Sequence, residues 1–142
     1  MNLNIVNAKM TISINDLDNQ NVVLSTTILN GTSLSGIIDC QGFCPIAVIT
    51  PTAWTAASLT AQGSIDGITF FPILGNTSTQ LVLCTAIGTT GYQLIVTTSS
   101  GFIGNPLPRY IKLRSGTDAV PVNQLADRAF TIILQPNLWR KP

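Results

Sequence analysis

The sequence predicts an all-β protein that folds as a single antiparallel β-sandwich. Short runs rich in β-branched residues recur between turn residues, and no window of about ten or more residues has the apolar spacing of an amphipathic helix. The number of these runs suits two packed sheets, and 142 residues are enough for one sizeable core. We therefore expect one domain over residues 1–135 and a C-terminal extension over 136–142.

The pattern within the runs indicates how individual strands are placed. In the run at 110–114, Lys112 and Arg114 share one face while Ile111 and Leu113 share the other, which is typical of a strand with one solvated side. Pro72 indicates that its run forms an edge strand or contains a bulge. The runs expected to be strands cover residues 21–29, 37–39, 46–49, 57–63, 69–73, 81–84, 92–96, 110–114 and 129–134.

A tight turn is expected at residues 65–68. Asp66 and Gly67 stand between two strand-like runs, and Asp-Gly is a strong signal for a type I′ hairpin turn, which needs positive φ at both central positions. We therefore assign Asp66 and Gly67 a structural role.

The residue inventory argues against catalysis. The chain has no His and no Glu, so it lacks the commonest general base and the commonest metal ligand. Seven basic residues nearly cancel six Asp, so no strong attraction to nucleic acid or to anionic lipid is expected. We expect no enzyme activity, no cofactor and no metal site.

The N-terminal residues lack the basic and apolar regions of a signal peptide, and no stretch approaches about 18 apolar residues. We therefore expect synthesis in a cytoplasm and no association with a membrane.

Three cysteines, Cys40, Cys44 and Cys84, are expected to be small buried hydrophobic residues. The spacing of Cys40 and Cys44 fits half of a zinc site, but neither a second pair nor a His completes four ligands. A disulfide from Cys84 to either of the others requires an oxidising medium.

Residues 67–108 contain no charged side chain. Solitary soluble domains usually carry mixed charge on every face, and interface cores are depleted of charge. The alternative is that neutral Thr, Ser, Asn and Gln side chains solvate this surface. We favour assembly with protein.

Three stretches carry a resemblance to a known family. They are residues 54–71 with the step Ser64-Ile65-Asp66-Gly67, residues 109–117 with the strand Arg109-Tyr110-Ile111-Lys112-Leu113-Arg114, and residues 121–128. Together they resemble small structural proteins of tailed bacteriophages, over about 51–134, and more loosely the galactose-binding-like jelly roll. The resemblance implies a jelly-roll sandwich more directly than it implies a ligand.

Two functions follow from the resemblance. The first is a virion structural protein, such as a capsid decoration or cement protein or the base of a head spike or fibre, which binds the major capsid protein or another virion protein. The second is a carbohydrate-binding module on the virion surface, which needs aromatic side chains clustered in loops. Its candidates are Trp54, Phe43, Phe71, Tyr92 and Phe102, although Trp54 is better explained by packing.

We expect a homo-oligomer, with a trimer favoured by the resemblance. Trp139 and Arg140 stand in the C-terminal extension, and both residue types are common energetic anchors, so they are the candidate intersubunit contacts. Asp127 and Arg128, which follow Asn123 and Gln124, form either a polar binding site or, as we favour, charge-assisted hydrogen bonds that close a loop, with Arg114 and Asp118 nearby in the sequence.

Overall fold

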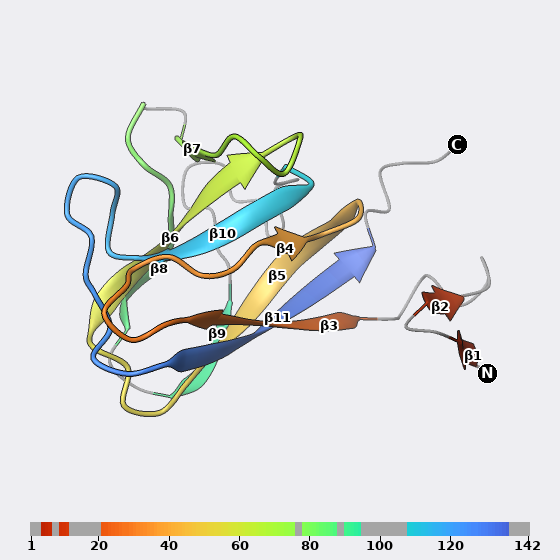
Figure 1. Cartoon of the computed structure of the whole chain (residues 1–142), viewed down its shortest axis with the longest axis horizontal. Coiled ribbons are helices and arrows are strands. Elements are labelled where there is room, and N and C mark those ends of the chain that lie inside the picture. The colour runs from red at the N-terminus through yellow and green to blue at the C-terminus, as the bar shows by residue number, and fades with distance from the viewer. Residues whose placement is uncertain are drawn as a thin grey trace.

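The protein is all-β and forms a sandwich of two antiparallel sheets (Figure 1). The computed structural model describes residues 4–6, 9–11, 21–75, 78–87, 90–94 and 108–136. No helix occurs among these residues, and consequently none that is long and apolar enough to span a bilayer.

Each sheet is built from strands that are distant in the sequence. Sheet 1 has the order β3–β11–β5–β9, and sheet 2 has the order β4–β10–β6–β7, with β8 also paired to β6. The strands of sheet 1 are β3 (Val22–Ile28), β5 (Phe43–Thr50), β9 (Gly91–Leu94) and β11 (Arg128–Pro136). The strands of sheet 2 are β4 (Ile38–Asp39), β6 (Ala57–Ser64), β7 (Phe71–Pro72), β8 (Val82–Ile87) and β10 (Tyr110–Ser115).

The connections confirm the expected jelly roll. From β3 to β6 the chain alternates between the sheets, and it does so again from β9 to β11. This alternation places each central strand between partners that come from other parts of the chain, as in two interlocked Greek keys. Strands β10 and β11 lie at the centres of the two sheets.

The alternation predicted for β10 is confirmed. Ile111 and Leu113 are buried between the sheets, while Lys112 and Arg114 lie on the outer side of sheet 2. There the Lys112 Nζ lies 4.3 Å from the centre of the Phe70 ring, which gives the ammonium a cation–π contact.

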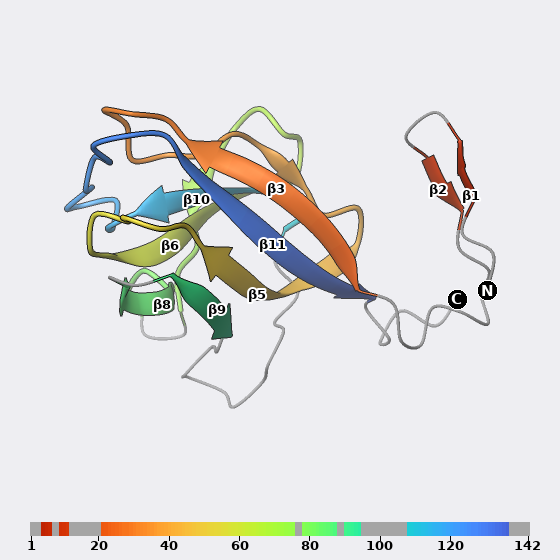
Figure 2. The same cartoon turned by 90° about the horizontal axis from the view of Figure 1, so that it is seen from below.

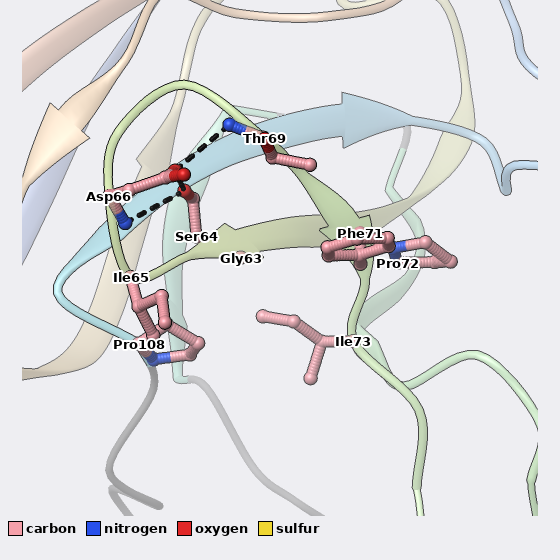
Figure 3. A pocket seen from close by; sticks show the side chains of 9 residues that line it. All are labelled: Gly63, Ser64, Ile65, Asp66, Thr69, Phe71, Pro72, Ile73 and Pro108. Atoms are coloured by element: carbon pink, nitrogen blue, oxygen red, sulfur yellow. Dashed lines mark hydrogen bonds between the residues drawn. The ribbon is translucent and has the colours of Figure 1, made fainter.

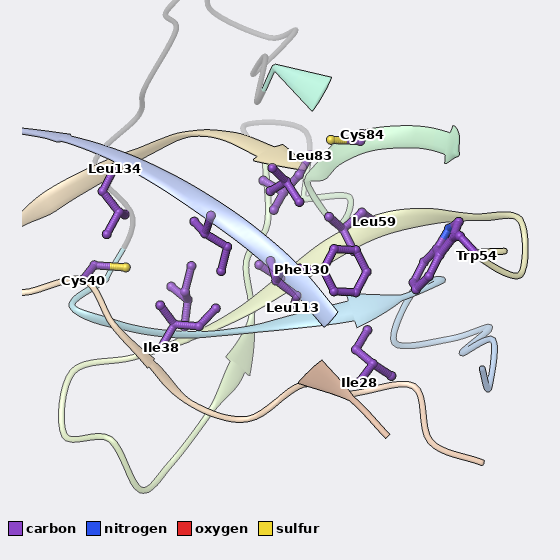
Figure 4. Packing of buried hydrophobic residues seen from close by; sticks show 14 of the residues in the cluster. Ile28, Ile38, Cys40, Trp54, Leu59, Leu83, Cys84, Leu113, Phe130 and Leu134 are labelled. Atoms are coloured by element: carbon purple, nitrogen blue, oxygen red, sulfur yellow. The ribbon is translucent and has the colours of Figure 1, made fainter. Parts of the chain in front are cut away.

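The core lies between β10 and β11 and is anchored by an aromatic pair (Figure 4). The rings of Trp54 and Phe130 meet edge to face, with centroids 5.0 Å apart. Both side chains are buried, so Trp54 packs inside the sandwich as favoured from the sequence and is not a platform for a sugar.

All three cysteines are buried as predicted, and none forms a disulfide. Cys40 and Cys84 belong to the core, whereas Cys44 lies on β5 outside the core cluster. Burial raises the pKa of Cys40 to about 12 and that of Cys84 to about 11, and it also raises the pKa of Cys44.

Gln124 is fully buried, and its hydrogen bonds join three loops. Its Oε1 accepts the Thr55 N–H at 2.9 Å, and its Nε2 donates to the Thr55 carbonyl at 3.1 Å and to the Ser115 hydroxyl at 2.8 Å. Its carbonyl accepts the Gly31 N–H at 2.8 Å, and its N–H donates to the Thr32 carbonyl at 2.9 Å. These bonds give a loop-closing role to Gln124, whereas the sequence led us to expect that role for the charged residues.

The charged residues near Gln124 also close loops, but not all in the expected pairs. Arg114 Nε lies 2.7 Å from Asp118 Oδ1. Asp127 accepts the Asn30 N–H at 2.8 Å, and no ion pair among the described residues joins Asp127 to Arg128.

The structure corrects several details of the sequence-based fold. Strands β1 (Asn4–Val6) and β2 (Lys9–Thr11) were not predicted, and they pair with each other but with neither sheet. The run at 69–73 is reduced to the two residues of β7, which sits beside β6 as an edge strand. The last strand continues to Pro136, and residues 137–142 of the expected extension lie outside the described residues.

Replacing Gln124 with Ala is expected to lower the free energy of unfolding by about 2–3 kcal/mol, because it removes the partners of the buried Ser115 hydroxyl and of the half-buried backbone groups of Thr55. Urea denaturation measures the change. The exposed Gln135 is the matched control, and its replacement by Ala should change the value by less than about 0.5 kcal/mol. Equal effects at the two positions would contradict the role of Gln124.

The folded protein is expected to resist labelling by a thiol reagent at Cys40, Cys44 and Cys84, because reaction requires an accessible thiolate. All three should react after denaturation in urea. Mass spectrometry counts the adducts, and rapid labelling of the native chain would show that the burial is wrong.

Candidate functional site

The candidate site is the loop between β6 and β7 together with the hollow beside it. Ser64 is the last residue of β6, and its hydroxyl accepts the N–H groups of Asp66 at 3.3 Å and Gly67 at 2.9 Å. The same hydroxyl donates to Asp66 Oδ1 at 2.7 Å. Asp66 Oδ1 also accepts the N–H group of Ile68 at 2.8 Å. It accepts the N–H group of Thr69 at 2.9 Å as well (Figure 3). Two side chains therefore fix the course of the whole loop.

The predicted turn lies at the expected place but has a different geometry. Gly67 has a φ of 74°, as a turn position requires, whereas Asp66 does not have positive φ. The connection from Ser64 to Phe71 is therefore a longer loop and not a two-residue type I′ turn. The sequence predicts positive φ at Asp66, because Asp tolerates that conformation. In the structure, Asp66 acts instead through its carboxylate, which accepts backbone N–H groups two and three residues ahead.

These hydrogen bonds also set the charge of Asp66. The bonds from the backbone of Ile68 and Thr69, followed by the bond from Ser64, lower the pKa of the carboxyl from 3.8 to about 2. Asp66 is exposed, and its carboxylate stays ionised at neutral pH because its pKa is lowered. All three of its bonds fall on Oδ1, and no described residue donates to Oδ2.

The loop carries apolar side chains into solvent. Ile65 is 90% exposed, Ile68 is 84% exposed, and Phe71 at the start of β7 is 65% exposed. Isolated exposed apolar residues are ordinary, but three that gather on one fixed loop are typical of an interaction surface.

A hollow of about 610 Å³ adjoins this loop. Apolar side chains form most of its wall, with Ser64, Asp66 and Thr69 on the polar side. Gly63 is required here because a Cβ at this position would lie 2.6 Å from Cγ of Pro108, which packs across β6. The residues that line the hollow are Gly63, Ser64, Ile65, Asp66, Thr69, Phe71, Pro72, Ile73 and Pro108.

The polar side chains at this site are already engaged in hydrogen bonds with the loop. The Ser64 hydroxyl is engaged in three hydrogen bonds, and no His exists in the chain to serve as its base. In the described part of the chain, no cluster of three or more Cys or Asp residues is placed to hold a metal ion. The site can offer apolar surface and one fixed negative charge.

The other residues singled out from the sequence do not join this site. Trp139, Arg140 and Phe102 lie outside the described residues. Phe43 packs against the core, and Tyr92 is exposed on sheet 1. Of the aromatic candidates for a glycan site that the structure describes, only Phe71 lines the hollow.

Sequence reasoning missed Ile65, Ile68 and Pro108. The sequence did contain a signal for the exposure of the two isoleucines. Ile65 and Ile68 flank Asp66-Gly67, and side chains at the tip of a loop lie far from the core. The contact of Pro108 with Gly63 joins distant parts of the chain, and no local pattern indicates it.

Comparisons with protein-family models, with curated proteins and with solved structures found no match to this chain.

The pH dependence of stability tests the role of the Asp66 carboxylate. Because its pKa is lowered in the folded state, ionised Asp66 stabilises the fold above about pH 4, and this contribution is lost as the pH falls toward 2. Asp66→Asn keeps an acceptor oxygen without the charge. Its melting temperature should lie below that of the wild type at pH 6, and the two should converge near pH 2.

Asp66→Ala is the control, because it removes the acceptor itself and should melt at a lower temperature throughout this range. Thermal unfolding followed by circular dichroism measures all three proteins. A difference between the wild type and Asp66→Asn that does not change with pH would contradict the assignment.

Proposed function

We propose that this chain is a non-enzymatic structural component of a bacteriophage particle, made in the host cytoplasm and attached to the shell through protein–protein contacts. A capsid decoration or cement protein, or the base of a spike, is the form that we favour. The resemblance of residues 51–134 to small phage structural proteins supports the setting. The observation that carries the proposal is the fixed loop that exposes Ile65 and Ile68 beside an apolar hollow.

A loop of this kind is well suited to docking. Burial of Ile65 and Ile68 against a partner would contribute about 1.5–3 kcal/mol for each side chain. The hydrogen bonds of Ser64 and Asp66 already hold the loop, so little conformational entropy is lost on binding.

The charge of Asp66 adds a requirement on the partner. No described residue donates to its Oδ2, so the complementary surface would be apolar with a Lys or Arg placed against this carboxylate. The major capsid protein is the expected partner, and a homo-oligomer of this chain is the expected form.

A carbohydrate-binding module is the second candidate. The observation in its favour is that Phe71 lines the hollow next to the Asp66 carboxylate, which combines a stacking surface with a hydrogen-bond acceptor for sugar hydroxyls. It is second because Trp54 and Phe43 pack inside the sandwich and do not converge on this loop.

Co-sedimentation with particles of the encoding phage, purified without this chain, tests the proposal. The double variant Ile65→Ser/Ile68→Ser should bind these particles at least about ten-fold more weakly than the wild type. Leu125→Ser is the matched control, because Leu125 is also highly exposed but follows the other end of β10, and it should bind as the wild type does.

Wild-type binding by the double variant would overturn the role of the loop. Absence of the chain from complete particles, measured by quantitative mass spectrometry, would overturn the virion role. Glycan binding that is lost in Phe71→Ala, without any binding to particles, would favour the second candidate.

A further inference from the structure

The hollow beside the β6–β7 loop lies at the end of the sandwich where the last strand finishes. In Figure 1, strands β6 and β11 point toward the same end of the molecule. Ser64, the last residue of β6, lies opposite Tyr110, the first residue of β10, and Pro108 stands two residues before Tyr110. Ser64 and Pro108 both line the hollow, which therefore belongs to this end.

Hydrogen bonds connect the end of β11 to the same place. Pro136 pairs with Phe43, the first residue of β5, and Figure 2 shows β11 and β5 side by side. The Phe43 N–H donates to the Cys40 carbonyl at 2.7 Å, and the Cys40 N–H donates to the Arg109 carbonyl at 2.7 Å. Arg109 directly follows Pro108 of the hollow. The six residues that follow β11 therefore start at the end that holds the hollow.

These six residues, 137–142, are called the tail, and their chemistry is complementary to that of the hollow. The tail places one large aromatic side chain, Trp139, directly before two cations, Arg140 and Lys141. The wall of the hollow is mostly apolar and carries one carboxylate, that of Asp66, to whose Oδ2 no described residue donates. The volume of about 610 Å³ is in the range that accepts drug-sized ligands, so the hollow has room for an indole ring.

The tail starts close enough to dock on its own chain. Trp139 is the third residue after Pro136, and three residues of extended chain span about 10 Å, to which the indole adds its own length. The two sheets of a sandwich pack about 10 Å apart. A tail that is tethered to the hollow also meets it at a high effective concentration, which favours docking on the same chain over docking on a second copy.

We propose that the tail docks on its own chain, with Trp139 in the hollow and Arg140 against the Asp66 carboxylate. The ring then packs against the exposed side chains of Ile65 and Phe71, and the Arg140 guanidinium donates a charge-assisted hydrogen bond to Oδ2. The sequence led us to expect these two tail residues at contacts between subunits, and that arrangement is the competing outcome of the test.

Fluorescence quenching by acrylamide tests the docking. The chain has two Trp, and Trp54 is only 4% exposed, so any strongly quenched emission comes from Trp139. Both rings should be protected in the wild type. Ile65→Ser removes apolar wall from the hollow and should raise the quenching constant of Trp139 at least about three-fold. Ile68→Ser is the matched control, because Ile68 is similarly exposed in the same loop but does not line the hollow.

Charge substitutions test the pairing with Asp66. Arg140→Glu should also expose the Trp139 ring, because it brings a second carboxylate to the first, whereas Arg140→Lys keeps the charge and should keep the protection. Lys9→Glu is the control, because it changes the net charge as Arg140→Glu does but lies in β2, which pairs with neither sheet. Circular dichroism melting curves verify that each variant folds.

Carbodiimide cross-linking identifies the copy that supplies the tail. The reagent joins the Asp66 carboxyl to the Lys141 amine as an amide with loss of water, and isotopically light and heavy chains are refolded together beforehand. Cross-linked peptides should be all light or all heavy. Mixed peptides would show that the tail comes from a second copy and would overturn the proposal. A readily quenched Trp139 in the wild type, or equal effects of Ile65→Ser and Ile68→Ser, would also overturn it.

One consequence of the docked tail rests on the proposed function. The tail supplies the apolar contact and the cation that a shell partner would supply, so the two compete for the same site. Trp139→Ala should therefore bind purified particles at least about three-fold more tightly than the wild type. Equal binding would overturn the competition. A protected Trp139 without any binding to particles would leave the docked tail standing and would count against the virion role alone.

Discussion

The apolar layer between β10 and β11 is the contact on which the rest of the molecule depends. These two strands are central in their sheets, and Leu113 and Phe130 are buried where they face each other. Each sheet excludes water from the inner face of the other sheet, so the inner faces are buried only when the two sheets pack together. Trp54 extends the layer by packing its ring edge to face against Phe130. Because the strands are held by this packing, the loops at both ends of the sandwich begin and end at fixed positions.

Hydrogen bonds from polar side chains then hold these loops in defined conformations. At one end, Gln124 satisfies buried groups of several loops at once. At the other end, Ser64 and Asp66 bond to the backbone of the loop that follows β6, so Ile65 and Ile68 are held in solvent without help from the core. The physical arrangement is a rigid scaffold that carries an exposed apolar loop, and the proposed binding role is based on this loop.

The surfaces of the molecule differ in the charged side chains that they carry. The outer side of sheet 2 carries cationic side chains that are locally engaged, Lys112 with the Phe70 ring and Arg114 with Asp118. The outer side of sheet 1 carries none among the described residues of its strands. The loop beside the hollow has a single fixed carboxylate between isoleucines.

The sequence by itself determined the features that depend on near neighbours in the chain. Period-2 alternation placed Ile111 and Leu113 inside and Lys112 and Arg114 outside, because successive residues of a strand point to opposite faces. The sequence also located the turn at Asp66 and Gly67. It predicted positive φ at Asp66, whereas in the structure the Asp66 carboxylate holds the loop through hydrogen bonds. Only the tertiary structure decided which strands share a sheet, and hence that Val23, Ile133 and Ala47 form one neutral row and that Pro108 packs over Gly63. The physical reason is that these contacts join residues far apart in the chain, and their free energy depends on how the two sheets close upon each other, which no local pattern records.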